Sequence, residues 1–309
     1  MSLKLKVPDE LAGQRLDVVV ARLAPQISRR QARRLVDDGG VFVDGKRVQV
    51  CSRALRSGAV IEVSVTAPHD RAAPPPRILA LDADVVVVDK AAGVPTEPTR
   101  EGSRGTLKAG LDEALSARGE DIRFLHAAHR LDTHATGVVI FARSSEAAHQ
   151  VGRQLHEGSA ERRYFALVTG APTWTRARLD WSLHRTPGAD GRIHVDEDGA
   201  PSLTLVTVLA RGARASLALC VPRTGRTHQL RVHLAEAGHP LVGDKRYGGG
   251  RRTHHLGLHA FSVSLVHPAG KPVRYSAAPP PSFLEAAGDG GIPAHVVDEV
   301  SLFLLGGRA

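Results

Sequence analysis

The sequence has few of the features that mark exported or membrane proteins. Among its 309 residues are two cysteines, Cys51 and Cys220, too few for a disulfide framework or a closed thiolate zinc site. The longest apolar runs, such as residues 85–88, are far shorter than the roughly 20 residues that cross a bilayer. The first 17 residues lack the apolar core of a secretory signal. We therefore expect a cytoplasmic protein with no membrane partner.

Motifs of nucleotide-dependent enzymes are missing as well. The chain has no Walker-type loop and no dinucleotide-binding glycine motif. The segment from His129 to Asp132 differs from a kinase catalytic loop, because Leu131 is inserted and position 137 is glycine. His228 and His233 are five residues apart with no acidic residue between them, which is not the spacing of a zinc-binding helix. We expect no cofactor and no metal.

What the sequence does contain is an excess of positive charge. It has 41 Lys and Arg residues against 32 Asp and Glu, a formal net charge of +9, and a pI of about 10.1. The first 66 residues hold 12 basic and 7 acidic side chains, so about a fifth of the chain carries over half of the excess. With 42% hydrophobic and 24% charged residues, the composition is typical of a globular protein. Such a surface favours a polyanionic partner.

Proline clusters indicate how the chain is divided. Residues 67–77 (APHDRAAPPPR) show no helical or alternating period and are typical of a semi-rigid linker. A second cluster at 279–281 closes the patterned region. We therefore expect a first domain at 1–66, a linker at 67–77, a second domain at 78–284 and a C-terminal tail at 285–309. A monomer is the simplest expectation.

The first domain is predicted to combine a helix with a hairpin. Ser28 precedes RRQARRLVDDGG, in which Ala32 and Leu35 share one face and Gly39 is the expected stop. The pair Asp44-Gly45 between alternating apolar residues predicts a hairpin turn. Together with RLD at 15–17 and RSGAVIEV at 56–63, this order resembles the ribosomal-protein-S-four-like RNA-binding domain. Its candidate RNA-binding side chains are Arg29, Arg30, Arg33, Arg34 and Lys46.

The second domain alternates strand and helix patterns. Helices are predicted after Ser144 and Ser145, ending at Gly158, and from about Thr227 to Ala237. The pattern indicates an α+β fold with a large mixed or antiparallel sheet, preceded by the small α/β RNA-binding domain. The predicted strands lie at 82–90, 137–143, 162–170, 203–209, 214–221 and 257–266.

Two clusters of residues carry the candidate chemistry. Asp132 lies in a polar loop directly before a buried-looking strand, a position that suits a catalytic carboxylate. On spacing alone, a salt-bridged turn in which Arg130 neutralises Asp132 is an equal alternative. In the second cluster, Leu230 and Leu234 lie on the inner side of the predicted helix, while Arg231 shares a neighbouring face with His228.

These clusters resemble the motifs of the RluA family of RNA pseudouridine synthases. His129 to Gly137 is similar to the family motif His-Arg-Leu-Asp-x-x-Thr-Ser-Gly, and Gly225 to His233 to Gly-Arg-Thr-His-Gln-x-Arg-x-His. Gly243-Asp244 with Tyr247 follows as Gly-Asp-x-x-Tyr. The resemblance covers about residues 12–283. The sequence departs from the pattern at Ala135, which lacks a hydroxyl, and at 90–93, where Lys-Ala-Ala-Gly stands for Lys-Pro-Ala-Gly.

The resemblance implies an enzyme that isomerises uridines in structured RNA, large-subunit ribosomal RNA first and transfer RNA second, by flipping the base and without a cofactor. It marks Asp132 as the catalytic aspartate, Tyr164 as the tyrosine that packs on the base and Arg231 as the partner of the aspartate. Two alternatives are an inactive RNA-binding or ribosome-assembly factor and a glycosidase-like hydrolase, which would need a second carboxylate. The other expected RNA contacts are His129, Arg130, Arg226, His228 and Gln229. We interpret His233, like His228, as a polar or RNA-facing group.

Overall fold

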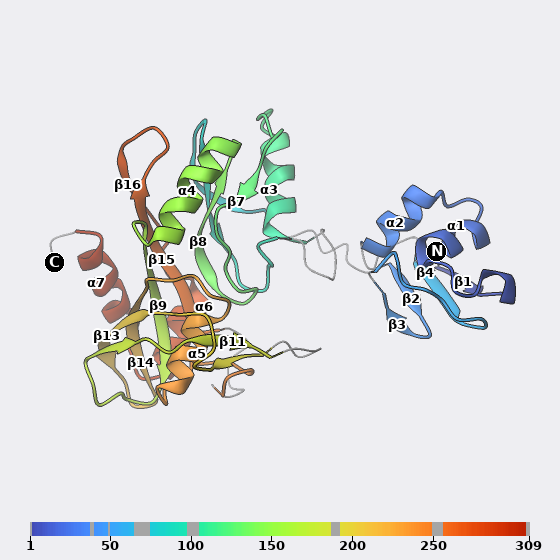
Figure 1. Cartoon of the computed structure of the whole chain (residues 1–309). Helices are drawn as coiled ribbons and strands as arrows, with labels where there is room; N and C mark the ends of the chain where they lie inside the picture. Colours follow the sequence, from blue (N-terminus) through green and yellow to red (C-terminus); the bar gives the residue numbers. More distant parts are fainter. Residues whose placement is uncertain are drawn as a thin grey trace. The chain divides into compact units, whose positions relative to one another are not determined.

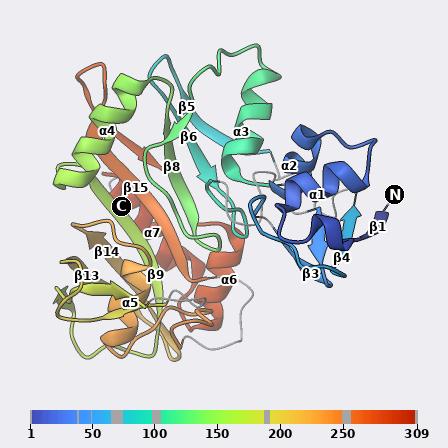
Figure 2. The same ribbon diagram turned by 45° about the vertical axis from the view of Figure 1, so that its right-hand side comes forward.

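The computed structural model describes residues 2–37, 40–48, 50–64, 75–97, 105–186, 192–248 and 256–306. Contacts divide the chain into two compact units, one with residues 1–75 and 97–117 and the other with residues 76–96 and 118–309 (Figures 1 and 2). Most of the proline-rich segment 67–77 lies outside the described residues, and its last residue, Arg77, already begins a strand. No helix in the described ranges is long and apolar enough to cross a membrane.

The first unit is built on a four-stranded antiparallel sheet in the order β1-β4-β2-β3. Its core joins Leu16, Val19 and Val20 of one helix to Val36 of the next and to Ile61 of the sheet, all fully buried. The elements are β1 (Ser2–Lys6), η1 (Asp9–Leu11), α1 (Leu16–Leu23), α2 (Arg29–Asp37), β2 (Val41–Val43), β3 (Lys46–Arg47), β4 (Val60–Ser64) and α3 (Leu107–Ser116).

The predicted helix and hairpin of this unit are present. Ser28 caps α2 reciprocally, since its Oγ accepts from Gln31 N (3.3 Å) and its own N–H donates to Gln31 Oε1 (2.8 Å). Asp44 (φ 51°) and Gly45 (φ 73°) both take positive φ, as the tight turn between β2 and β3 requires. Gly39, the expected helix stop, lies outside the described residues.

The second unit contains a ten-stranded mixed sheet with the order β10-β13-β14-β9-β15-β8-β6-β5, in which β16 also pairs with β15 and β7 with β8. Among the described pairs, β15 and β8 run parallel and the others antiparallel. The strands are β5 (Arg77–Leu81), β6 (Val85–Lys90), β7 (His126–Ala127), β8 (Thr136–Ala142), β9 (Glu161–Thr169), β10 (Arg176–Leu179), β13 (Thr204–Arg211), β14 (Ala215–Pro222), β15 (Leu258–Val266) and β16 (Pro272–Ser276). A separate hairpin joins β11 (Leu183–Arg185) to β12 (Ile193–Val195).

Helices cover the two halves of this sheet. In α4 (Ser145–Glu157), Val151 and Leu155 pack on β6, β8 and β15, and the helix begins where Ser144 Oγ accepts from Ala147 N (3.1 Å). It ends at Gly158 with φ 77°, as predicted. The helices α6 (Pro281–Asp289) and α7 (Ala294–Leu304) form a second core with Phe165 and Phe261.

The C-terminal segment 285–309 is therefore packed structure over most of its length, rather than a tail that follows the fold. Ile292 and Val297 are buried in the same core as Phe283. The proline cluster at 279–281 starts a helix instead of ending the patterned region, because proline at the first helical position sets φ and loses no intrahelical hydrogen bond.

Candidate active site

One cavity collects the three side chains that the family resemblance marks as catalytic. Its volume is about 340 Å³, and Asp132, Tyr164 and Arg231 line it. Asp132 comes from the loop before β8, Tyr164 from β9 and Arg231 from α5 (Gln229–Glu236). The fold thus joins Asp132 to a partner that lies 99 positions later in the chain.

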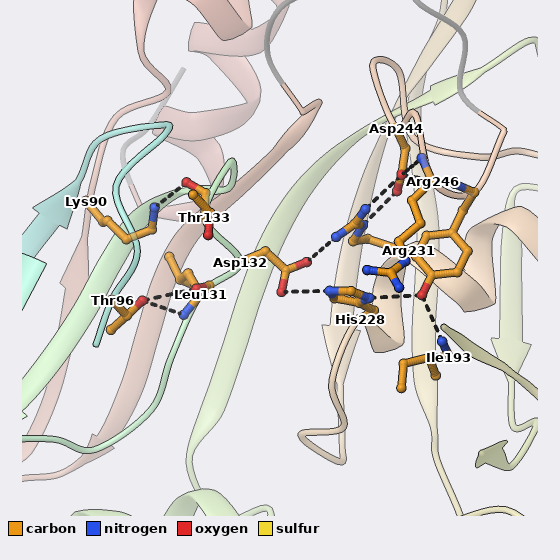
Figure 3. A network of polar contacts seen from close by, with 11 residues as sticks. Lys90, Thr96, Leu131, Asp132, Thr133, Ile193, His228, Arg231, Asp244 and Arg246 are labelled. Carbon is orange, nitrogen blue, oxygen red and sulfur yellow. Dashed lines mark hydrogen bonds and ion pairs between the residues drawn. The ribbon is translucent and has the colours of Figure 1, made fainter. Parts of the chain in front are cut away.

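The loop that carries Asp132 is held on both sides of that residue (Figure 3). Before it, Leu131 N donates to Thr96 Oγ1 (3.1 Å), and the same hydroxyl donates to Leu131 O (3.0 Å). After it, the carbonyl of Thr133 accepts from Lys90 Nζ (3.0 Å) and from Gly93 N (2.8 Å). The Asp132 carboxylate is left pointing toward α5, with 24% of its side chain exposed.

Lys90 stabilises this loop from the interior of the protein. It is fully buried, and its Nζ donates to three carbonyls, those of Ala91 (2.9 Å), Val94 (2.7 Å) and Thr133 (3.0 Å). Burial lowers the pKa of Lys90 to about 7, whereas three accepting carbonyls favour an ammonium with all three protons in use. Sequence reasoning misses this role, although the lysine at the start of Lys-Ala-Ala-Gly was a signal for it.

Arg231 links Asp132 to a second, buried carboxylate. Its Nη1 donates to Asp132 Oδ2 (3.0 Å), while Nε and Nη2 donate to Asp244 Oδ2 (2.7 Å) and Oδ1 (2.9 Å). Burial alone would lower the pKa of Arg231, but the hydrogen bonds with Asp244 and the charge of Asp132 raise it. Burial would likewise raise the pKa of Asp244, yet Arg231 holds it below its usual value. Asp244 therefore fixes the orientation of Arg231.

His228 contacts Asp132 from the other side and also shortens the predicted helix. Its φ is 55°, a left-handed conformation that cannot continue a helix, so α5 begins at Gln229 rather than near Thr227. Nδ1 lies 2.9 Å from Tyr247 Oη, and Nε2 lies 3.9 Å from Asp132 Oδ1. Burial lowers the pKa of His228, against the charge of Asp132. Tyr247 Oη in turn accepts from Ile193 N (3.2 Å), which anchors the histidine (Figure 3).

Tyr164 forms part of the cavity wall. It lies in β9 between Cys220 of β14 and Ala260 of β15, and only 8% of it is exposed. Burial raises the pKa of its hydroxyl, which therefore stays protonated at neutral pH. Tyr164 is thus a protonated aromatic side chain in the wall of the cavity.

The other predicted RNA contacts of this unit occupy different environments. Arg130 and Arg226 are exposed and line the cavity, and Arg226 Nε donates to Pro201 O (3.3 Å). His129 also lines it, but its Nε2 accepts from Ile140 N (3.3 Å), and burial lowers the pKa of its imidazole to about 3. His129 is therefore neutral and offers no positive charge to RNA.

Gln229 and His233 make their hydrogen bonds inside the protein, although Gln229 also lines the cavity. The amide of Gln229 is buried, donating to Leu203 O and Thr204 Oγ1 (3.0 Å each) and accepting from Thr224 Oγ1 (2.7 Å). It therefore shapes the loop before α5. His233 is fully buried between Thr204 Oγ1 and Trp181 O, both 3.0 Å away, so of its two interpretations the structure supports the polar group and not the RNA-facing one.

In the first unit, the arginines of α2 surround a buried acid. Asp17 is fully buried and accepts from Arg15 Nε (2.9 Å), Arg29 Nε (3.3 Å) and Arg33 Nε (2.8 Å). Arg29 and Arg33 remain about half exposed, and Arg30 is exposed. The side chains of Arg34 and Lys46 lie outside the described part of the structure.

One trio among the described residues has the composition of a metal site. Ligand atoms of Asp82, Asp84 and His267 lie within 4.8 Å of one another. His267 Nε2 is 3.1 Å from Asp82 Oδ2, and Asp82 Oδ1 accepts from two backbone N–H groups of its own turn. These contacts account for the cluster, and its residues do not line the cavity.

Comparisons with known proteins place this site in a class. A model described as RNA pseudouridylate synthase matches residues 84–236, and an S4 domain model matches residues 14–61. Ribosomal large subunit pseudouridine synthase D of Nitrosomonas europaea is 34% identical over 284 residues, covering 86% of this chain and 81% of that protein. Ribosomal large subunit pseudouridine synthase C of Vibrio cholerae is 30% identical over 300 residues, covering 92% and 95%.

A solved structure agrees with these matches. Human RNA Pseudouridylate Synthase Domain Containing 1 is 28% identical, with a TM-score of 0.57 over 71% of this chain and 88% of that one. Fold and relatives together define an RNA-modifying enzyme that carries an S4 domain. The chain belongs to the RNA pseudouridylate synthase family. The matches confirm the resemblance of the first domain to an S4 domain and that of the second domain to the pseudouridine synthases. The predicted α+β class is confirmed as well.

Proposed function

We propose that this protein converts specific uridines of large-subunit ribosomal RNA to pseudouridine, with Asp132 as the catalytic carboxylate. The observation that carries the proposal is the contact of Asp132 with Arg231 in a cavity that Tyr164 also lines. The choice of RNA rests on the names of the relatives, which act on the large ribosomal subunit. The basic cavity and the S4 domain fit an RNA substrate.

The cavity is of a size for one flipped nucleotide. About 340 Å³ is within the range of sites that enclose a small ligand. Flipping a base out of its stack costs a few kcal/mol, and stacking on an aromatic side chain returns about 1–3 kcal/mol. Tyr164 supplies such a ring, and Arg130 at the exposed edge supplies charge for the RNA backbone.

The reaction needs a carboxylate at the sugar and no redox partner. The bond between ribose C1′ and base N1 breaks, the base turns, and C1′ joins C5; the proton leaves C5, and N1 takes one up. Asp132 either attacks C1′ or removes the ribose 2′ proton, and both routes use the same ionised group. Arg231 holds that group in place through its bond to Oδ2, because Asp244 fixes the guanidinium.

The hydrolase alternative lacks the second carboxylate that it would need. Among the residues that line the cavity, Asp132 is the one carboxylate. Asp244 lies behind Arg231 with both oxygens hydrogen-bonded and its pKa lowered, so it cannot donate a proton to a leaving group at neutral pH.

We further propose a division of roles along the chain. Residues 1–66 form the RNA-binding domain, residues 67–77 link it to the catalytic domain at 78–284, and residues 285–309 complete the catalytic unit. The two family models fall inside the first and third of these segments. Arg29, Arg30, Arg33, Arg34 and Lys46 would contact the RNA. We propose that the protein acts as a monomer in the cytoplasm.

The test is a map of pseudouridines in ribosomal and transfer RNA from wild-type, deletion and Asp132→Asn strains. We expect the same large-subunit sites to be lost in both mutants. If the sites were lost from transfer RNA instead, the substrate would be transfer RNA and not ribosomal RNA. An unchanged map would favour an RNA-binding factor without activity.

A further inference from the structure

Arg162 is a buried cation that has no acidic partner in the described part of the structure. Only 7% of it is exposed, and its one hydrogen bond to a described residue runs from Nη2 to Thr224 O (3.2 Å). Its Nε is buried and has no hydrogen-bond partner, and no ion pair of Arg162 occurs among the described residues. Because a guanidinium stays charged, burial without a counterion is costly unless a ligand supplies the negative charge.

The guanidinium belongs to the wall of the catalytic cavity. Side chains alternate along β9, so Arg162 and Tyr164 point to the same side, and both line the cavity. Gly225, in the turn that precedes α5, passes directly over the guanidinium: a Cβ at this position would lie 3.0 Å from Arg162 Nη1. A side chain at position 225 would therefore press against Nη1, and glycine leaves that space unfilled.

A second buried donor without an acceptor lines the same cavity. His129 Nε2 accepts from Ile140 N, which places the imidazole proton on Nδ1, and Nδ1 is buried with no partner. Four arginines and a single carboxylate line the cavity, and that carboxylate, Asp132, is already paired with Arg231. The remaining lining arginines are Arg130, Arg162 and Arg226.

We propose that Arg162 and the Gly225 turn form a subsite for a backbone phosphate of the RNA, next to the flipped uridine. The phosphate supplies the missing counterion of Arg162 through charge-assisted hydrogen bonds. This inference rests on the proposed function, since it takes RNA as the substrate. It assigns Arg162 to binding and positioning, apart from the chemistry at Asp132.

The test compares Arg162→Gln with Arg163→Gln. Arg163 is the neighbouring arginine of β9, but it faces away from the cavity and pairs with Glu161 (2.7 Å), so it is a matched control. Binding of an unmodified large-subunit ribosomal RNA transcript is measured against KCl concentration in an Asp132→Asn background, which prevents turnover. We expect Arg162→Gln to weaken binding about tenfold and to flatten the salt slope by about 0.7, as loss of one phosphate contact requires.

Activity provides a second readout, through tritium released from C5 of the labelled transcript. Arg162→Gln should raise KM with little change in kcat, Arg162→Lys should keep the salt slope, and Arg163→Gln should match the wild type. Equal slopes for Arg162→Gln and the wild type would overturn the inference. If the wild type releases no tritium, the proposed function fails, and the binding slopes still decide the subsite.

A variant that keeps the buried arginine tests the subsite even if Arg162→Gln does not fold. Gly225→Ala places a methyl group against Nη1, and its backbone does not need positive φ. We expect it to weaken RNA binding several-fold with an unchanged melting temperature. If Arg162→Gln unfolds and Gly225→Ala binds RNA with wild-type affinity and salt slope, the subsite is refuted.

Discussion

Asp244 holds Arg231 through two parallel hydrogen bonds of 2.7 and 2.9 Å, leaving one guanidinium nitrogen for Asp132. Oδ1 of Asp244 also accepts from the backbone N–H groups of Arg246 (3.0 Å) and Tyr247 (3.2 Å). Planar two-point pairing fixes the angle of a guanidinium as well as its position. Asp244 thus determines the orientation of the Asp132 carboxylate, the proposed catalytic group, without touching it.

We expect Asp244→Asn to lower kcat about 100-fold with little change in KM, because a small displacement of Arg231 misplaces Asp132. The substitution also removes one of the two negative charges that neutralise the buried Arg231 guanidinium, which should lower the free energy of unfolding by about 3 kcal/mol. Tritium release at saturating RNA and chemical denaturation measure the two effects. A wild-type kcat in a folded Asp244→Asn protein would contradict the positioning role.

His228 provides a test of backbone conformation. Its φ of 55° suits glycine and strains other residues, so His228→Gly should be more stable than His228→Ala, by about 1 kcal/mol. Both variants lose the ring that lies between Tyr247 and Asp132, and both should lower kcat. Melting temperatures and tritium release separate the two effects. Equal melting temperatures would show that the loop relaxes and stores no strain.

The proposed catalytic trio could be named from sequence because Asp132 and Arg231 lie in recognisable motifs and the family resemblance marks Tyr164. The contacts that orient it could not, since the hydrogen bonds of Lys90 to Thr133 and of Arg231 to Asp244 join residues 43 and 13 positions apart in the chain, and composition does not record such pairings. Gln229 and His233 lie in the same motif as Arg231, yet they point into the protein, because α5 begins only after the left-handed residue His228. Their motif positions alone therefore did not distinguish substrate contacts from internal ones.

The C-terminal segment shows a different limit. Three prolines before Phe283 are compatible with both a helix start and the end of a domain, and the glycines at 288–291 favour the second interpretation. The choice is decided by packing, since Ile292 and Val297 fill a core made by β9, β14 and β15.

Asp17 predicts acid sensitivity of the first unit. Burial alone would raise the pKa of Asp17, but hydrogen bonds from Arg15, Arg33 and Arg29 hold it well below its usual range. A carboxyl whose pKa is lowered by folding stabilises the protein above its unfolded pKa of about 3.9, and this stability is lost as the pH falls further.

We therefore expect calorimetric melting of this unit to fall steeply below about pH 4 in the wild type and less steeply in Asp17→Asn. At neutral pH the substitution should cost about 2 kcal/mol, less than for a fully buried pair, because Arg29 and Arg33 are half exposed. If the melting temperatures of the two proteins fell in parallel with pH, Asp17 would not be the source of the acid sensitivity.

Lys90 couples stability to catalysis at the loop of Asp132. Lys90→Met keeps the length of the side chain but removes three hydrogen bonds to the carbonyls of Ala91, Val94 and Thr133. Buried acceptors left without donors cost about 1–3 kcal/mol each, although Thr133 O keeps its bond from Gly93 N. We expect a loss of about 3 kcal/mol and a lower kcat, because the backbone next to Asp132 is no longer fixed.

Lys108→Met is the matched control for this substitution. Lys108 pairs with Asp112 (2.9 Å) at the surface of α3, and such pairs contribute less than about 1 kcal/mol. We therefore expect Lys108→Met to keep both the stability and the kcat of the wild type, and Lys90→Met to lose part of each. Denaturation curves measure the stability, and tritium release measures kcat. If Lys90→Met lost stability but kept full kcat, the hydrogen bonds of Lys90 would support the fold without positioning Asp132.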